Sequence, residues 1–317
     1  MSKSSRYPSY VDCVAQVLSQ SREPMSLDTL ITHIAGQRPL TRNARSAVMR
    51  ALDQLYQAVP IAPDHYCWLS AILDGSVFRH PLTNEEARQG FLLLDELEHA
   101  VLFPDFFQNH TVDGRTLSIE LFGAETVQAW TEVERQIWSL RLGKEFVEWL
   151  ENQGAMGRDD LVLTVMDASA GRYGLRLQPR EARDAETIQQ RNIELAKLAT
   201  ELVLNAADNG FELAIWGLAA RLIARKYYNH PVPPDELHYV LQKFSSLTEN
   251  EQGVLYQSTS LPKSGEGLLA WEYNGKRVAQ EREHSIFDFS DEVERESDDD
   301  LWLSMGHDAS LHLGEGE

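Results

Sequence analysis

The stretch Thr41-Arg-Asn-Ala-Arg-Ser-Ala-Val-Met-Arg-Ala-Leu-Asp-Gln-Leu55 decides the interpretation of this chain. Its apolar residues recur at the spacing of one helix face, which predicts a helix that is capped by Thr41 and runs to about Leu55. At about 100° per residue, the opposite face gathers long polar side chains. The expected buried face holds Ala44, Ala47, Val48, Ala51, Leu52 and Leu55, and the opposite face holds Arg42, Arg45, Ser46 and Met49, with Asn43 and Arg50 beside it.

Two shorter helices are expected before this one. Ser9 and Asp12 have the spacing of a capping box, and the apolar residues that follow predict a helix from there to about Leu18. A second helix is expected from Ser26 to Ile34, after Pro24.

A β-hairpin is expected after the third helix. Residues 59–61 and 66–69 have strand character, and the residues between them, Pro63-Asp64-His65, are typical of turns. Three helices followed by a hairpin wing are the pattern of a winged helix-turn-helix, whose third helix enters the major groove of DNA.

Arginine and asparagine on such a helix suit DNA, because the Arg fork binds guanine or phosphate and Asn binds adenine. The predicted DNA-binding residues are Arg38, Thr41, Arg42, Asn43, Arg45, Ser46, Met49, Arg50 and His65. Two alternatives stay open: these arginines only solvate the outer face of the domain, or the domain docks on a protein.

Two runs in this region resemble a known family. Tyr10-Val-Asp-Cys-Val-Ala-Gln-Val-Leu18 and Glu23-Pro-Met-Ser-Leu-Asp-Thr-Leu-Ile31 are similar to the HARE-type helix-turn-helix domain over roughly residues 7–72. The resemblance implies a winged helix of the kind found in bacterial transcription factors, the delta subunit of RNA polymerase, restriction enzymes and chromatin-associated proteins. The sequence departs from the usual pattern in the compact stretch Gln37-Arg-Pro-Leu-Thr41.

The middle of the chain is expected to hold a helical linker over residues 73–110 and a β-rich, barrel-like domain over residues 111–182. The segments Leu140-Arg-Leu-Gly-Lys-Glu-Phe-Val-Glu-Trp-Leu150 and Gly157-Arg-Asp-Asp-Leu-Val-Leu163 resemble part of a plant B3-type DNA-binding pseudobarrel. Arg158 interrupts the Gly-Asp pair of that pattern. A scaffold domain that contacts protein is the alternative.

Residues 187–260 return to a helical period, with three helices and a short strand. This region is expected to be either a second winged helix or a plain helical bundle. A second basic patch is expected there from Arg221, Arg225 and Lys226. The alternative is that these cations only stabilise the C-terminal end of their helix through its dipole. From residue 276 to residue 317 we expect a disordered acidic tail, because dense like charges oppose compaction.

Charge is unevenly distributed. The chain of 317 residues has a net charge of −20, but residues 1–70 hold seven Lys or Arg against five Asp or Glu, and residues 281–317 hold two against thirteen. An acidic chain cannot rely on bulk attraction to DNA, so a few arginines would have to carry the binding. Protein docking, to RNA polymerase or to a restriction or defence complex, is therefore a close rival to DNA binding.

Several classes of protein are not expected. The sequence has no apolar run long enough for a membrane span and no secretion signal, which predicts a cytoplasmic protein. Cys13 and Cys67 lack metal-ligand spacing and are expected to be free thiols. No nucleotide-binding loop, nucleophile elbow or zinc motif occurs, so we expect no enzyme, cofactor or metal, with a nuclease as the remote exception. The sequence therefore predicts an α+β, multidomain, DNA-binding transcription regulator.

Overall fold

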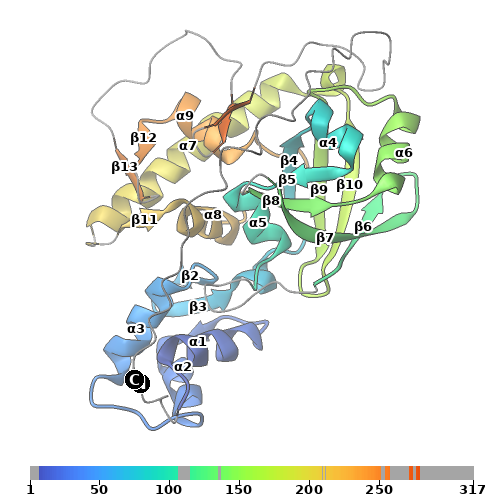
Figure 1. Ribbon diagram of the computed structural model, residues 1–317. Helices are drawn as coiled ribbons and strands as arrows, with labels where there is room; N and C mark the ends of the chain where they lie inside the picture. Colours follow the sequence, from blue (N-terminus) through green and yellow to red (C-terminus); the bar gives the residue numbers. More distant parts are fainter. Residues whose placement is uncertain are drawn as a thin grey trace, which may run out of the picture. The chain divides into compact units, whose positions relative to one another are not determined.

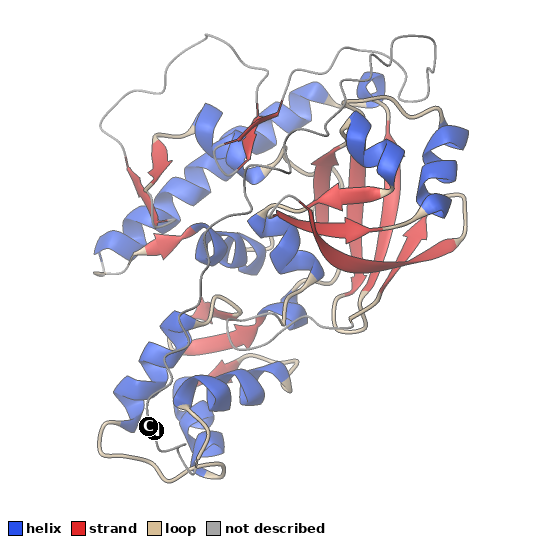
Figure 2. Cartoon of the chain, viewed as in Figure 1, coloured by secondary structure: helices blue, strands red, loops and turns tan. Residues whose placement is uncertain are grey.

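Helices and strands alternate along the chain and give a mixed α+β fold, as predicted (Figures 1 and 2). The computed structural model describes residues 7–105, 115–134, 137–208, 210, 212–250 and 254–257, and the backbone of 271–273 and 276–278. These residues lie within one compact unit, Met1–Ile286. Most of the predicted acidic tail lies outside the described residues.

The N-terminal module holds three helices and a three-stranded antiparallel sheet. It contains α1 (Tyr10–Ser19), β1 (Met25–Ser26), α2 (Leu27–Ala35), α3 (Ala44–Gln54), β2 (Ala58–Ala62) and β3 (His65–Trp68), with sheet order β1-β3-β2. The three predicted helices and the predicted hairpin are thus confirmed as elements. The Ser9 hydroxyl accepts from the Asp12 amide at 3.1 Å, and Asp12 accepts from the Ser9 amide at 3.2 Å, which confirms the capping box.

Apolar faces of the three helices meet in the core of this module. Leu18, Leu30, Ile34 and Val48 are fully buried there, together with Trp68 from β3. Burial of each aliphatic side chain contributes roughly 1.5–3 kcal/mol, so this packing fixes which face of α3 points inward. Cys13 and Cys67 are free and buried, as predicted, and burial raises the pKa of both thiols.

A curled sheet of seven strands forms the middle of the chain (Figure 2). Its order is β4-β9-β10-β6-β7-β8-β5, and all neighbours are antiparallel except β6 and β10. The strands are β4 (Val77–Pro81), β5 (Phe91–Leu93), β6 (Leu117–Leu121), β7 (Thr126–Glu134), β8 (Ile137–Arg141), β9 (Asp160–Asp167) and β10 (Arg172–Gln178). Since β4 and β5 are edges, the sheet is an open half-barrel.

The expectation of a helical linker over residues 73–110 is wrong at the level of secondary structure. This stretch supplies both edge strands, β4 and β5, as well as α4 (Asn84–Gln89) and α5 (Glu96–Leu102). Short apolar runs such as Phe91–Leu94 fit a buried strand as well as a helix, so periodicity cannot separate the two. α4 packs beside α6 (Lys144–Gln153) at one end of the sheet (Figure 1).

The C-terminal module repeats the element order of the N-terminal one. It contains α7 (Ala185–Asp208), β11 (Leu213–Ala214), α8 (Ile215–Ala224), α9 (Leu237–Phe244), β12 (Leu247–Glu249) and β13 (Val254–Gln257). Its antiparallel sheet has the order β11-β13-β12, which matches β1-β3-β2 position by position. The three predicted helices are present, and the sheet excludes a plain helical bundle.

Candidate nucleic-acid interface

The two faces of α3 are separated as its sequence predicts. Ala44, Val48, Ala51 and Leu52 are buried, whereas the other face is in solvent. We call this exposed set the α3 face; it consists of Arg42, Asn43, Arg45, Ser46, Met49 and Arg50. Its helical members point outward because the buried stripe fixes the rotation of the helix, and Arg42 and Asn43 are exposed directly before it.

The start of α3 differs from the prediction. The helix begins at Ala44, and Asn43 occupies the N-cap position without a side-chain hydrogen bond. Thr41 is not the cap; its hydroxyl lies 3.3 Å from the Tyr10 hydroxyl, and its amide donates to the same oxygen. The hydrogen bond to Thr41 lowers the pKa of Tyr10. Thr41 therefore ties the segment before α3 to α1.

Arg38 is also engaged inside the module. Its Nη1 donates to the carbonyl of Pro8 at 2.6 Å, and its guanidinium carbon lies 3.9 Å from the centre of the Tyr10 ring. The side chain is half-buried, so its contribution is to hold the segment before α3 against α1.

Arg45 faces two carboxylates. Its Nη1 donates to Asp28 at 2.5 Å, and its Nη2 lies 4.0 Å from Asp64. Asp28 is in the first turn of α2, and Asp64 is in the turn of the hairpin. Sequence reasoning did not include either carboxylate in the site, because neither has a fixed sequence spacing to Arg45.

The other residues of the α3 face differ from Arg45 in their surroundings. Within the described part of the chain no carboxylate pairs with Arg42, and Arg50 donates from Nε to the carbonyl of Ser46 at 3.3 Å. Met49 is 40% exposed, which is high for a side chain of its size and polarity. His65 is exposed, with Nδ1 at 2.9 Å from the carbonyl of Pro63.

The hairpin that follows α3 has a short, fixed turn. Only Pro63 and Asp64 separate β2 from β3, and the Asp64 carbonyl accepts from the Leu27 amide at 2.8 Å. β1 pairs with β3 so that Ser26 lies opposite His65. The turn is thus attached to the start of α2, and His65, a predicted site residue, is the first residue of β3 directly after it.

Arg221 is more buried than Arg225 and Lys226, the other members of the predicted second basic patch. Burial lowers the pKa of Arg221, and the nearby charge of Arg225 helps to lower it. The charges of Asp53 and Tyr66 from the N-terminal module oppose that shift. Arg225 and Lys226 are exposed, and Lys226 adopts a left-handed backbone conformation with φ of 55°. Arg221 thus faces α3 and β3, whereas Arg225 and Lys226 face solvent.

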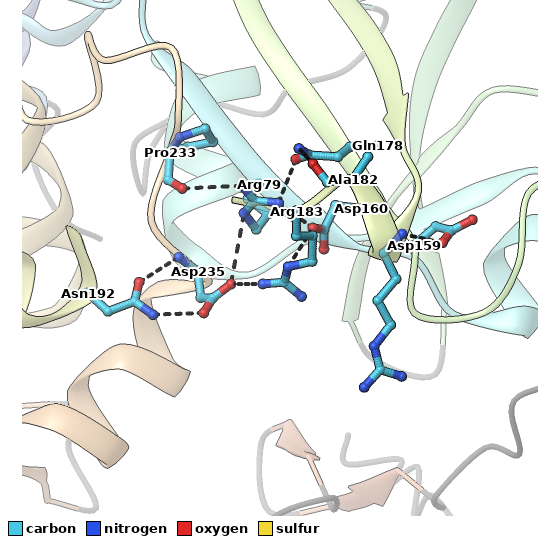
Figure 3. Close-up of polar contacts among 10 residues, drawn as sticks. Arg79, Asp159, Asp160, Gln178, Ala182, Arg183, Asn192, Pro233 and Asp235 are labelled. Atoms are coloured by element: carbon cyan, nitrogen blue, oxygen red, sulfur yellow. Dashed lines mark hydrogen bonds and ion pairs between the residues drawn. The ribbon is translucent and has the colours of Figure 1, made fainter. Parts of the chain in front are cut away.

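A buried network of charges joins the half-barrel sheet to the C-terminal module (Figure 3). Arg79 of β4 pairs with Asp160 of β9 and donates to Gln178 at 2.9 Å. Arg183 pairs with Asp235, and its Nε lies 3.3 Å from Asp160.

Asn192 completes this network from α7. It donates to the Asp235 carboxylate at 2.7 Å and accepts from the Asp235 amide at 2.8 Å. Two arginines and two aspartates therefore balance each other, and the arrangement suits a structural joint better than a ligand site. Sequence reasoning missed it, because its members span four separate elements.

A second buried cluster surrounds α5. His80 lies 2.7 Å from Glu98 and 3.0 Å from Glu86, and these two carboxylates raise its pKa against the effect of burial. His238 of α9 lies 2.6 Å from Glu96. No group of three or more His, Cys, Asp or Glu side chains in the described residues is arranged to hold a metal ion. Among the same residues no helix combines the length and apolar character of a membrane span.

Comparison with known proteins adds little to this geometry. No protein-family model matches the chain, and no curated protein matches its sequence. Among solved structures, the Arabidopsis FUS3–DNA complex matches 32% of this chain and 94% of the FUS3 chain, with 11% sequence identity and a TM-score of 0.24. FUS3 is a plant B3-domain protein, but a TM-score this low supports no inference about this chain. The HARE-type resemblance stays a prediction.

Proposed function

We propose that this chain is a DNA-binding regulator of transcription that contacts duplex DNA through a winged helix in its N-terminal module. One observation carries the proposal: Arg45 and Arg50 are presented to solvent from a helix whose other face is locked into a core, and Arg42 and Asn43 are exposed directly before that helix. The β2–β3 hairpin would be the wing, with His65 at its tip. We propose a binding role without catalysis.

The physical basis is local charge and not net charge. Residues 1–70 hold seven Lys or Arg against five Asp or Glu, so the module as a whole attracts DNA weakly. Arg42 and Arg50 carry charge that no described carboxylate neutralises, and each cation that meets a phosphate releases counterions. We therefore expect roughly micromolar, salt-sensitive affinity for random duplex DNA.

Fluorescence anisotropy of the full-length protein with a labelled random duplex tests the proposal. Arg42→Ala combined with Arg50→Ala should weaken binding by about ten-fold or more and reduce the salt slope by about 2. Arg176→Ala, which removes an exposed arginine from β10 in the half-barrel sheet, is the matched control and should change neither quantity. Equal loss in both variants, or loss in neither, contradicts the proposed face.

A second candidate function is a protein adaptor, which is favoured by the two carboxylates beside Arg45 and by exposed apolar side chains. Leu40, Met49 and Ile61 are 43%, 40% and 37% exposed, and all three belong to α3 or the segments that flank it. An adaptor would join RNA polymerase or a restriction or defence complex. Purified RNA polymerase, treated with nuclease, should be retained by the wild-type chain and lost with Met49→Ala and Ile61→Ala if this function holds.

A further inference from the structure

Arg45 lies beside two backbone segments that hydrogen bonds hold in place, the start of α2 and the turn of the β2–β3 hairpin. Asp28 is in the first turn of α2, which is capped by the Ser26 hydroxyl accepting from the Thr29 amide at 3.2 Å. Asp64 has φ of 55°, and its carbonyl is bonded to the Leu27 amide at 2.8 Å. The backbone at each carboxylate is therefore fixed beside Arg45, and the side chains of Arg45, Asp28 and Asp64 are 53%, 84% and 65% exposed.

The three arginines of the α3 face are thus not equivalent. Arg45 meets carboxylates at 2.5 Å and 4.0 Å, while Arg42 meets none among the described residues. Arg50 uses Nε for the Ser46 carbonyl and keeps its net charge. The positive charge of this face is concentrated at Arg42 and Arg50, and the surroundings of Arg45 carry more negative than positive charge.

The negative charge beside Arg45 decides which of two DNA groups this arginine can bind: a backbone phosphate or the edge of a guanine. A phosphate is an anion, so Asp28 and Asp64 oppose its approach to Arg45 at distances well inside the Debye length, which is about 8–10 Å. The major-groove edge of guanine is neutral and presents two acceptors, O6 and N7, to the planar fork of arginine. A carboxylate that fixes the fork also reduces the freedom that binding would remove.

We infer that Asp28 and Asp64 reserve Arg45 for reading a guanine, while Arg42 and Arg50 take phosphates. The inference rests on the proposed DNA binding and specifies its ligand: a duplex with a G·C pair facing the first turn of α3. Asp28 and Asp64 are positioning residues in this scheme and touch no base themselves.

The test uses full-length protein and the duplex that it selects from a random library. Each G·C pair of that duplex is replaced in turn by A·T, and the loss of affinity is measured by anisotropy. Wild-type protein should lose about 5- to 100-fold at one guanine, which is the range of a bidentate Arg–guanine contact. Arg45→Lys, which keeps the charge and loses the fork, should remove this discrimination while binding to random duplex persists.

The variant Asp28→Asn with Asp64→Asn is decisive. Asparagine tolerates the left-handed backbone at position 64, and both substitutions preserve side-chain size, so the fold should persist. Discrimination at the guanine should fall below about 3-fold, and the salt slope should rise by about 1, because the freed Arg45 then takes a phosphate. Glu125→Gln, in the β6–β7 turn, removes an exposed carboxylate from another module and should match wild-type.

The outcomes distinguish a failure of the role given to Arg45 from a failure of the proposed DNA binding. Undiminished discrimination in the double asparagine variant, or a wild-type selection without guanine, overturns the role of Arg45. If the double Ala variant at Arg42 and Arg50 binds DNA as well as wild-type protein, the α3 face is wrong and the inference fails with it; if wild-type protein binds no duplex DNA, the proposed function itself is wrong.

Discussion

His238 on α9 places its Nε2 2.6 Å from a carboxylate oxygen of Glu96 on α5, although the two residues are 142 positions apart in sequence. This ion pair joins the C-terminal module to the helix that follows the sheet edge. Burial alone would lower the pKa of His238, but the hydrogen bond and charge of Glu96 raise it to about 9. The partner of this pair, Glu96, has a lowered pKa.

The pair predicts an alkaline loss of stability. Because the folded pKa of His238 is above its ordinary value of 6.5, its contribution is complete below pH 6.5 and is lost as the pH rises to about 9. We expect a loss of about 1–2 kcal/mol over this range, reduced by the solvent that screens the partly exposed pair. Thermal unfolding at constant ionic strength measures it. His238→Gln should lower the Tm at pH 6 and reduce the fall in Tm between pH 6.5 and pH 9. If that fall is unchanged in the variant, His238 does not cause it.

The raised pKa of Asp95 predicts a second loss of folding stability, at lower pH than that of His238. Burial, with the charge of Glu98, raises the pKa of Asp95 from 3.8 to about 7, so its contribution is complete below pH 3.8 and is lost as the pH rises to 7. Asp95→Asn removes this titration and keeps an N-cap for α5, where the side chain accepts from the Glu98 amide at 2.7 Å.

We therefore expect Asp95→Asn to be about 1–3 kcal/mol more stable than wild-type at pH 8 by urea unfolding. At pH 4 the two proteins should differ little. Asp95→Ala, which also removes the cap, separates the effect of charge from that of capping. A variant less stable than wild-type at pH 8 would contradict the raised pKa of Asp95.

The buried network around Arg79 predicts that substitutions at Arg79 and Asp160 have non-additive effects on the free energy of unfolding. Arg79→Met leaves Asp160 and Asp235 with Arg183 alone, and loss of one partner from a buried pair costs about 3–5 kcal/mol. Adding Asp160→Asn restores the balance between Arg183 and Asp235, so the double variant should be more stable than Arg79→Met. Glu132→Gln in the exposed pair with Arg141 is the control and should cost less than about 1 kcal/mol in urea unfolding.

Position 90, between the end of α4 and the start of β5, has no room for a side chain. Gly90 has φ of 71°, and a Cβ built on it would lie 2.6 Å from the carbonyl oxygen of Gly143. Gly90→Ala must therefore displace backbone as well as adopt a strained conformation, and we expect a loss of more than about 2 kcal/mol. Gly123→Ala has a similar φ of 77° but no atom within 4 Å of the new Cβ. It should cost about 1 kcal/mol, and equal Tm losses would contradict the steric explanation.

Several features of the N-terminal module follow from its sequence. The spacing of Val48 and Leu52 predicted the buried side of α3 and so the exposure of Arg45 and Arg50. The capping box at Ser9 predicted where α1 begins. Both are local properties, because helix geometry and capping depend on residues within one or two turns.

The half-barrel sheet was harder to predict. Its β4 and β5 come from a stretch expected to be helical, and they become the two edges of one sheet by pairing with β9 and β8. Pairing over such a sequence distance depends on the whole chain, so short apolar runs do not reveal it.

The sequence by itself determined the α+β class, the helices of both terminal modules and the outward face of α3, because periodicity and caps act within a few residues. Only the tertiary structure decided the electrostatic setting of that face. It places Asp28 and Asp64 beside Arg45 and leaves Arg42 without a described carboxylate, and it puts Asp53 near Arg221. These contacts arise where separate elements pack, and no spacing along the chain encodes the distance between two charges on different elements.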